Sequence, residues 1–194
     1  MMWFLKMTYR VLFSWGAYFA WSKLYRAIYH EKFRGTKLDG GLTPEEVAQA
    51  MKQLTWTKDG FREVGDAIGS AHWVQHCVNA VQAKLKQPEG SLDCDEFSVW
   101  AATVMGVDHA PQVLNVVWRE GKSVGGHHVC VYVTEEGLTR HTGNWGDRGP
   151  FAGVRRAIVD VLHAMKKSEK DLVGWATFSP TLKLSAWGNS LPPA

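Results

Sequence analysis

Residues 93–133 read DCDEFSVWAATVMGVDHAPQVLNVVWREGKSVGGHHVCVYV, and the hydrophobic period changes within this stretch. The first part has apolar residues at helical spacing, which predicts a helix that begins at Cys94 or the residue before it and ends at Gly106. Beyond Gly106 the period becomes two, which predicts strands over 113–118 and 129–133. A helix followed directly by strands is therefore the central feature of the predicted fold.

Two further helices are expected upstream of this stretch. Residues 43–46, Thr-Pro-Glu-Glu, form a helix start with Thr43 as N-cap, Pro44 at the first helical position and a Glu placed for a capping box. A second helix is expected behind Ser70 and before the Pro-Glu-Gly turn at residues 88–90. The apolar faces of these two helices are Val47, Met51 and Leu54 in the first, and Val74, Cys77, Val78, Val81 and Leu85 in the second.

Downstream, the pattern predicts a third strand over 138–142, a fourth helix over 154–165 and a final apolar segment over 172–178. Helices first and a small antiparallel sheet after them indicate an α+β domain, which we place at residues 39–180. Residues 181–194 are expected to form a loose C-terminal tail.

The positive charge of the chain is concentrated at its N-terminus. The formal net charge is +3, but residues 1–38 hold seven basic residues and one acidic residue, and the rest of the chain holds 15 basic and 18 acidic residues. This basic, aromatic-rich arm is interpreted as an amphipathic helix on the domain or a partner, a membrane-surface segment, or a targeting signal. Because the remaining chain is net acidic, nucleic-acid binding is not expected.

Three cysteines, Cys77, Cys94 and Cys130, cannot form a closed disulfide framework, and no Cys/His pattern matches a zinc site. No metal or cofactor is therefore expected. Cys94 differs from the other two cysteines because it falls at the predicted start of a helix, where unpaired N–H groups and the helix dipole favour a thiolate.

Histidines and an asparagine follow Cys94 in an order that suits nucleophilic catalysis. His128 opens an apolar strand and is a candidate base for Cys94. His141 and Asn144 lie on or just beyond the next strand, and either could hydrogen-bond the imidazole as the third group of a triad. In the alternative reading, Cys94 is an ordinary buried thiol, and its acidic neighbours would raise its pKa.

Several segments resemble those of transglutaminase-like cysteine peptidases, within the wider papain-like superfamily. Residues 90–102, GSLDCDEFSVWAA, resemble the nucleophile segment G-x-x-D-C-D-[DE]-[FY]-[AS], and residues 128–133 resemble the H-x-W-V-x-V strand. Residues 144–146, Asn-Trp-Gly, resemble the segment with the third triad member. Residues 56–59 resemble the W-x-x-D segment that precedes the nucleophile region, so the resemblance covers roughly residues 43–148.

The resemblance implies a papain-like or transglutaminase-like core with Cys94 as nucleophile, His128 as general base and acid, and Asn144 as the orienting residue. Asn144 departs from the Asp usual in this family, and a neutral residue cannot stabilise an imidazolium by charge. His141 competes for this role, because NlpC/P60-type peptidoglycan hydrolases place a second histidine there. The Cys94 backbone N–H is the expected oxyanion donor, with Gln87 or Trp56 as a second donor.

The implied function is a thiol-dependent hydrolase that cleaves an amide bond through a thioester. Its substrate would be a peptide, a protein or peptidoglycan. Such small chains resemble those of bacteria and their viruses, which implies a cytoplasmic location or one associated with a virion or cell envelope. The competing interpretation is a non-catalytic member that keeps the fold as a binding or assembly module, since a fold does not fix a function.

Overall fold

The structure, a computed structural model, describes residues 33, 35–57, 71–89 and 92–193. The expected N-terminal arm therefore lies almost wholly outside the described residues, as does Ser70, behind which the second helix was predicted. Among the residues described, no helix is both long and apolar enough to cross a membrane.

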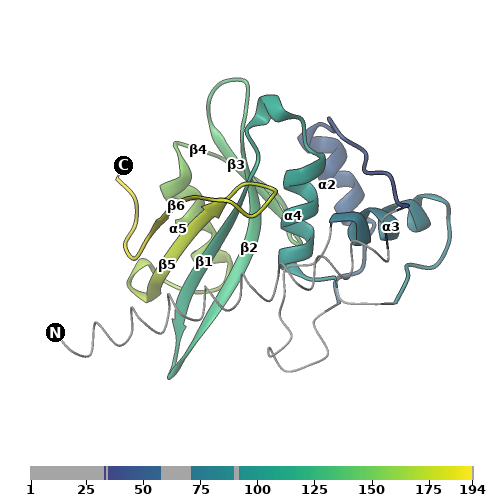
Figure 1. Cartoon of the computed structure of the whole chain (residues 1–194). Helices are drawn as coiled ribbons and strands as arrows, with labels where there is room; N and C mark the ends of the chain where they lie inside the picture. Colours follow the sequence, from purple (N-terminus) through teal and green to yellow (C-terminus); the bar gives the residue numbers. More distant parts are fainter. Residues whose placement is uncertain (1–32, 34, 58–70, 90–91, 194) are drawn as a thin grey trace.

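Four α-helices and a six-stranded antiparallel sheet make up this part of the chain (Figure 1). The helices and two short 3-10 turns are α2 (Pro44–Lys52), α3 (Ala71–Gln82), α4 (Cys94–Val104), η1 (Val107–His109), α5 (Val154–Ala164) and η2 (Glu169–Asp171). The strands are β1 (Gln112–Glu120), β2 (Ser123–Val133), β3 (Thr139–Gly143), β4 (Gly146–Phe151), β5 (Leu172–Phe178) and β6 (Leu184–Gly188). Their order in the sheet is β4-β3-β2-β1-β5-β6, so the α+β class is confirmed.

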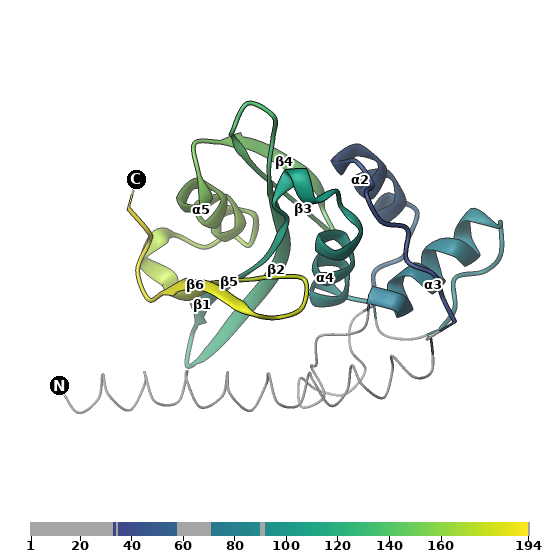
Figure 2. The same ribbon diagram turned by 45° about the horizontal axis from the view of Figure 1, so that its top comes forward.

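The sheet lies between two helical layers. Figure 2 shows α5 against one face and α2, α3 and α4 on the other side. Each face has its own apolar core, because alternate residues of the central strands point to opposite sides. On β2, for example, Cys130 and Tyr132 belong to the core under α4, whereas Val129 and Val131 belong to the core under α5.

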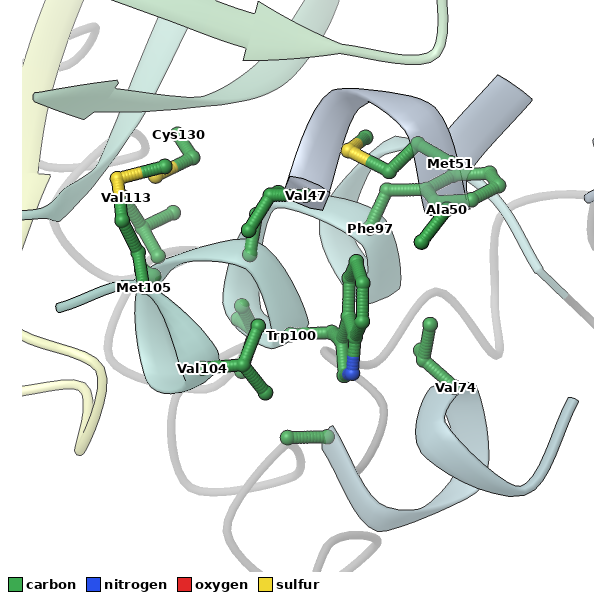
Figure 3. Close-up of a cluster of buried hydrophobic side chains, with 14 of the residues drawn as sticks. Val47, Ala50, Met51, Val74, Phe97, Trp100, Val104, Met105, Val113 and Cys130 are labelled. Atoms are coloured by element: carbon green, nitrogen blue, oxygen red, sulfur yellow. The ribbon is translucent and has the colours of Figure 1, made fainter. Parts of the chain in front are cut away.

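Helix α4 is buried along most of its length, because it lies between the sheet and the other helices (Figure 3). Trp100, fully buried, is its largest side chain, and its indole N–H donates a 3.0 Å hydrogen bond to Gln75 Oε1 of α3. The Gln75 amide in turn donates to Asp39 Oδ2 at 2.7 Å. These bonds satisfy two buried polar groups and fix α3 against α4.

The helix starts follow the expected capping rules. Thr43 caps α2 through a capping box with Glu46, as the sequence predicted. Asp93 caps α4 in the same way with Glu96, so Cys94 is the first residue of the helix. In the second helix, however, Leu85 lies beyond the last turn and is 65% exposed, so its assignment to the apolar face was wrong.

Three features of the sheet differ from the sequence expectation. β1 and β2 are longer than predicted and meet in a tight turn at Gly121-Lys122, because the whole 123–128 segment pairs with β1. β4 was not predicted as a strand. The C-terminal segment is also not a loose tail throughout, since Leu184–Gly188 pairs with β5 as an edge strand.

The β1–β2 hairpin contains a close packing contact that a single methyl group would disturb. A Cβ at Gly125 would lie 2.7 Å from the indole nitrogen of the buried Trp118, its cross-strand partner. We expect Gly125→Ala to destabilise the protein by about 1–3 kcal/mol, because Trp118 has no room to move. At the adjacent Gly126 the nearest atom is 3.6 Å away, so Gly126→Ala is the matched control. Thermal unfolding should separate the two variants, and equal shifts would contradict this account.

Candidate active site

The three cysteines have different surroundings. Cys77 and Cys130 are completely buried, and burial raises the pKa of Cys77 to about 12 and that of Cys130 further still. Cys94 is partly exposed at the first position of α4. A thiol at that position is next to helix N–H groups that have no partner within the helix, which favour a negative charge.

The carboxyl groups beside Cys94 have pKa values shifted in different directions. Burial raises the pKa of Asp95 well above its usual range, and the neighbouring Glu96 raises it further. Burial also acts to raise the pKa of Asp93, but hydrogen bonds from Asp95 and Glu96 outweigh it and hold this pKa below its usual range. The two carboxyl groups that flank Cys94 in the chain are therefore not equivalent: the pKa of Asp95 is raised and that of Asp93 is lowered.

His128 lies on β2, the strand on which α4 packs. It precedes Cys130 and Tyr132 by two and four residues, and it therefore belongs to the same face of the sheet as these residues of the α4 core. Burial lowers the pKa of His128 to about 4, and the nearby Asp93 carboxylate partly opposes this effect. The N-terminus of α4 and the His128 ring thus lie close enough to interact electrostatically, and the imidazole is neutral at pH 7.

Asn115 of β1 holds the His128 ring. The two residues are directly paired in the β1–β2 register, and Asn115 Nδ2 lies 2.6 Å from His128 Nε2. In this orientation Asn115 Oδ1 is buried with no hydrogen-bond partner among the described residues. Turning the amide over places Oδ1 against Nε2, where it accepts the Nε2–H bond. That orientation leaves the imidazole proton on Nε2 and makes Nδ1 the basic nitrogen.

The structure places Asn144 and His141 elsewhere. Asn144 lies in the turn between β3 and β4, and its side chain hydrogen-bonds His127, the residue beside His128 on the opposite face of β2. His141 is completely buried on the α5 face of the sheet, where its Nε2 lies 2.9 Å from Asp160 Oδ2. The structure therefore places Asn115, rather than Asn144 or His141, against the His128 ring.

The other face of the sheet at this point carries an aromatic and charged cluster. His127 stacks on Trp145 with ring centroids 4.2 Å apart, and His141 stacks on Phe151 at 5.6 Å. Burial lowers the pKa of His127 to about 3, so this ring is neutral as well. The cluster fixes β2 to the β3–β4 hairpin, and it sits across the sheet from Cys94.

Sequence reasoning missed Asn115 because it lies within an apolar strand. The segment VLNVVW was interpreted only as a strand, although a polar amide among buried apolar residues requires a hydrogen-bond partner. That signal pointed to a polar neighbour, but only the strand register identified it as His128.

The segment with Trp56 lies beside the start of α4. Thr57 and Leu92 form an antiparallel bridge with backbone hydrogen bonds of 2.9 and 3.1 Å, and Leu92 precedes Cys94 by two residues. Lys58 and Asp59 of the W-x-x-D segment lie outside the described residues. The Gln87 amide forms two hydrogen bonds with the Thr55 backbone, of 2.7 and 3.0 Å, which hold this side chain against the segment that contains Trp56.

Within the described part of the chain, one cluster of side chains could hold a metal ion. The side chains of Asp93, Cys94 and Asp95 each offer a ligand atom, and these atoms lie within 4.8 Å of one another. The N-terminus of α4 carries a partial positive charge that opposes a cation at this place. Asp93 already accepts the Asp95 N–H bond at 3.2 Å as the helix cap.

Comparison with known proteins does not assign this site to a family. No model of a known protein family matches the chain, and no curated protein matches it. The residues of the site are therefore the basis for any functional class of this protein.

Proposed function

We propose that this protein is a thiol-dependent hydrolase of the cysteine peptidase or amidase type, with Cys94 as nucleophile, His128 as general base and acid, and Asn115 as the positioning residue for the histidine. The observation that carries the proposal is the hydrogen bond between Asn115 and His128, on the strand against which the helix of Cys94 packs. A nucleophile, a base and a third group that orients the base are the components that such catalysis requires.

The reaction consists of two acyl transfers. His128 Nδ1 takes the proton of the Cys94 thiol, and the sulfur attacks the amide carbonyl carbon. The imidazolium then gives that proton to the leaving amine as the C–N bond breaks, which leaves a thioester on Cys94. Water attacks the thioester and passes a proton through His128 to the Cys94 sulfur, which releases the carboxylic acid. The Cys94 backbone N–H, at the start of α4, is the donor for the oxyanion in both steps.

The surroundings of His128 agree with this role. A neutral imidazole is required to take the thiol proton, and a pKa of about 4 keeps His128 neutral at pH 7 but makes it a weaker base than an ordinary histidine. Asn115 Oδ1 on Nε2–H selects the tautomer in which Nδ1 is the base. Because Asn115 is uncharged, it does not raise the pKa of His128 as a carboxylate would.

The pH dependence of Cys94 alkylation tests this proposal. We expect the second-order rate constant with iodoacetamide to decrease below about pH 4, where His128 becomes protonated, rather than near 6.5 as for an ordinary histidine. This decrease of the rate at low pH is the acid limb of the pH–rate profile. His128→Ala should remove the acid limb and slow the reaction at pH 6, because the thiol then has no base. The rates are followed by mass spectrometry of the Cys94 peptide.

Asp93→Asn is the companion variant. Asparagine caps a helix as well as aspartate does, so α4 is expected to remain intact. The substitution removes the negative charge that favours protonated His128, and the acid limb should move to lower pH. A profile with a single thiol limb, unchanged in His128→Ala, would refute the proposed pairing of Cys94 with His128.

The structure lends no support to the peptidoglycan hydrolase variant that uses a second histidine. In that variant His141 would orient His128, whereas here it bonds Asp160 on the opposite face of the sheet. Peptidoglycan therefore remains a substrate to be assayed beside peptides, with Asn115 rather than His141 as the positioning residue.

A further inference from the structure

An exposed tryptophan is held rigidly beside the entry to α4. Trp56 is 47% exposed, although it is one of the largest apolar side chains in the protein. Both of its chain neighbours are fixed by hydrogen bonds to other segments: Thr55 bonds the Gln87 amide twice, and Thr57 bonds the Leu92 backbone twice. Four hydrogen bonds thus fix the backbone around a side chain that is itself half in water.

This arrangement differs from that of the other exposed apolar side chains in the described residues. These other residues lie after the end of α3, in η1, on β2, before β3 and on the edge strand β6: Leu85, Val107, Val124, Val133, Leu138, Leu184 and Trp187. Trp56 is instead next to a residue that pairs with Leu92, and Leu92 is separated from Cys94 by Asp93 alone. Two residues of extended chain span about 7 Å, so a peptide bound across Cys94 passes this segment within one or two residues.

We propose that Trp56 is a specificity-determining residue, an apolar surface that binds an aromatic or branched aliphatic side chain of a peptide substrate beside the scissile amide. A partly exposed tryptophan on a hydrogen-bonded backbone suits this role because it offers a large apolar area with only two side-chain torsions to order on binding. The Asp93 carboxylate, whose pKa is held below its usual range, acts against acidic side chains at the same place. This inference rests on the proposed function, because it assigns a substrate class to the Cys94 site.

Two alkylating agents with the same reactive group test the inference in the full chain. Iodoacetamide and N-benzyl-iodoacetamide differ by one benzyl group, a methylene that carries a phenyl ring. Their rate constants at Cys94 are compared as a ratio, normalised to the same ratio for N-acetylcysteine in solution. We expect the normalised ratio to be about 10 in the native protein, which corresponds to about 1.4 kcal/mol of apolar contact.

Three variants test whether the Trp56 ring causes the preference for the benzyl reagent. Trp56→Ala should reduce the normalised ratio to about 1, whereas Trp56→Phe should keep most of it, because phenylalanine retains an aromatic surface but has no N–H group. Leu85→Ala, a change at another exposed apolar residue, should leave the ratio unaltered. An unchanged ratio in Trp56→Ala would overturn the inference, and so would an equal loss in Trp56→Phe, which would indicate a role for the indole N–H.

The same data separate this inference from the proposed function. The proposed function concerns the absolute iodoacetamide rate: it fails if Cys94 reacts no faster than N-acetylcysteine at pH 6 and is indifferent to His128→Ala. The inference concerns the ratio of the two reagents and its dependence on Trp56. A rapid Cys94 with a ratio of 1 would therefore overturn the inference alone.

Discussion

Replacement of Cys94 by alanine is expected to lower amide hydrolysis by a factor of about 10³ or more, since no other group in the described site can form the thioester. The same substitution should abolish rapid labelling by iodoacetamide. Cys77 and Cys130 should label slowly in every folded variant, because both are fully buried and burial raises the pKa of each thiol. Fluorescein-labelled casein and purified peptidoglycan serve as substrates, and mass spectrometry reports which thiol carries the label.

Cys94→Ser provides the control for structure. Serine has nearly the same size as cysteine and is tolerated at the start of a helix, so this variant should unfold at the same temperature as the native protein. It should nevertheless be as inactive as Cys94→Ala, because a serine hydroxyl beside His128 is a far weaker nucleophile at neutral pH. Equal labelling of all three cysteines in the folded native protein would be incompatible with an activated Cys94.

Asn115→Ala is expected to reduce the rate of Cys94 alkylation and of hydrolysis by about 10²-fold, because His128 loses the group that fixes its ring and tautomer. It should also lower stability by about 1–3 kcal/mol, since a buried ring nitrogen loses its partner. Asn144→Ala is the matched variant: Asn144 contacts His127 rather than His128, and we expect less than about a three-fold effect on rate.

Asn115→Asp separates positioning from a merely structural role. The aspartate keeps an acceptor for Nε2–H and adds a negative charge, which should raise the pKa of His128 from about 4 and move the acid limb of the alkylation profile upward. A purely structural Asn115 would leave that limb in place. If Asn144→Ala abolished the reaction while Asn115→Ala left it intact, the assignment of the third residue would have to return to Asn144.

Much of the fold could be read from local patterns in the chain. The helices at α2 and α4 and their caps followed from Thr43 and from the apolar spacing after Cys94, because helix starts depend on residues within one turn of each other. The core of β1, β2 and β5 followed from apolar runs. β4 and β6 could not be predicted in this way, because their residues are mostly exposed and carry little hydrophobic pattern.

The sequence by itself determined that Cys94 begins an apolar helix and that His128 opens an apolar strand, since both statements depend on neighbouring residues. Only the tertiary structure decided which asparagine meets His128. Asn115 lies 13 residues before His128, and the antiparallel register of β1 and β2 brings the two side chains together on one face of the sheet. The period of two in a strand directs His127 and its partner Asn144 to the opposite side. A shift of one residue in that register would exchange the two faces, and no local pattern fixes it.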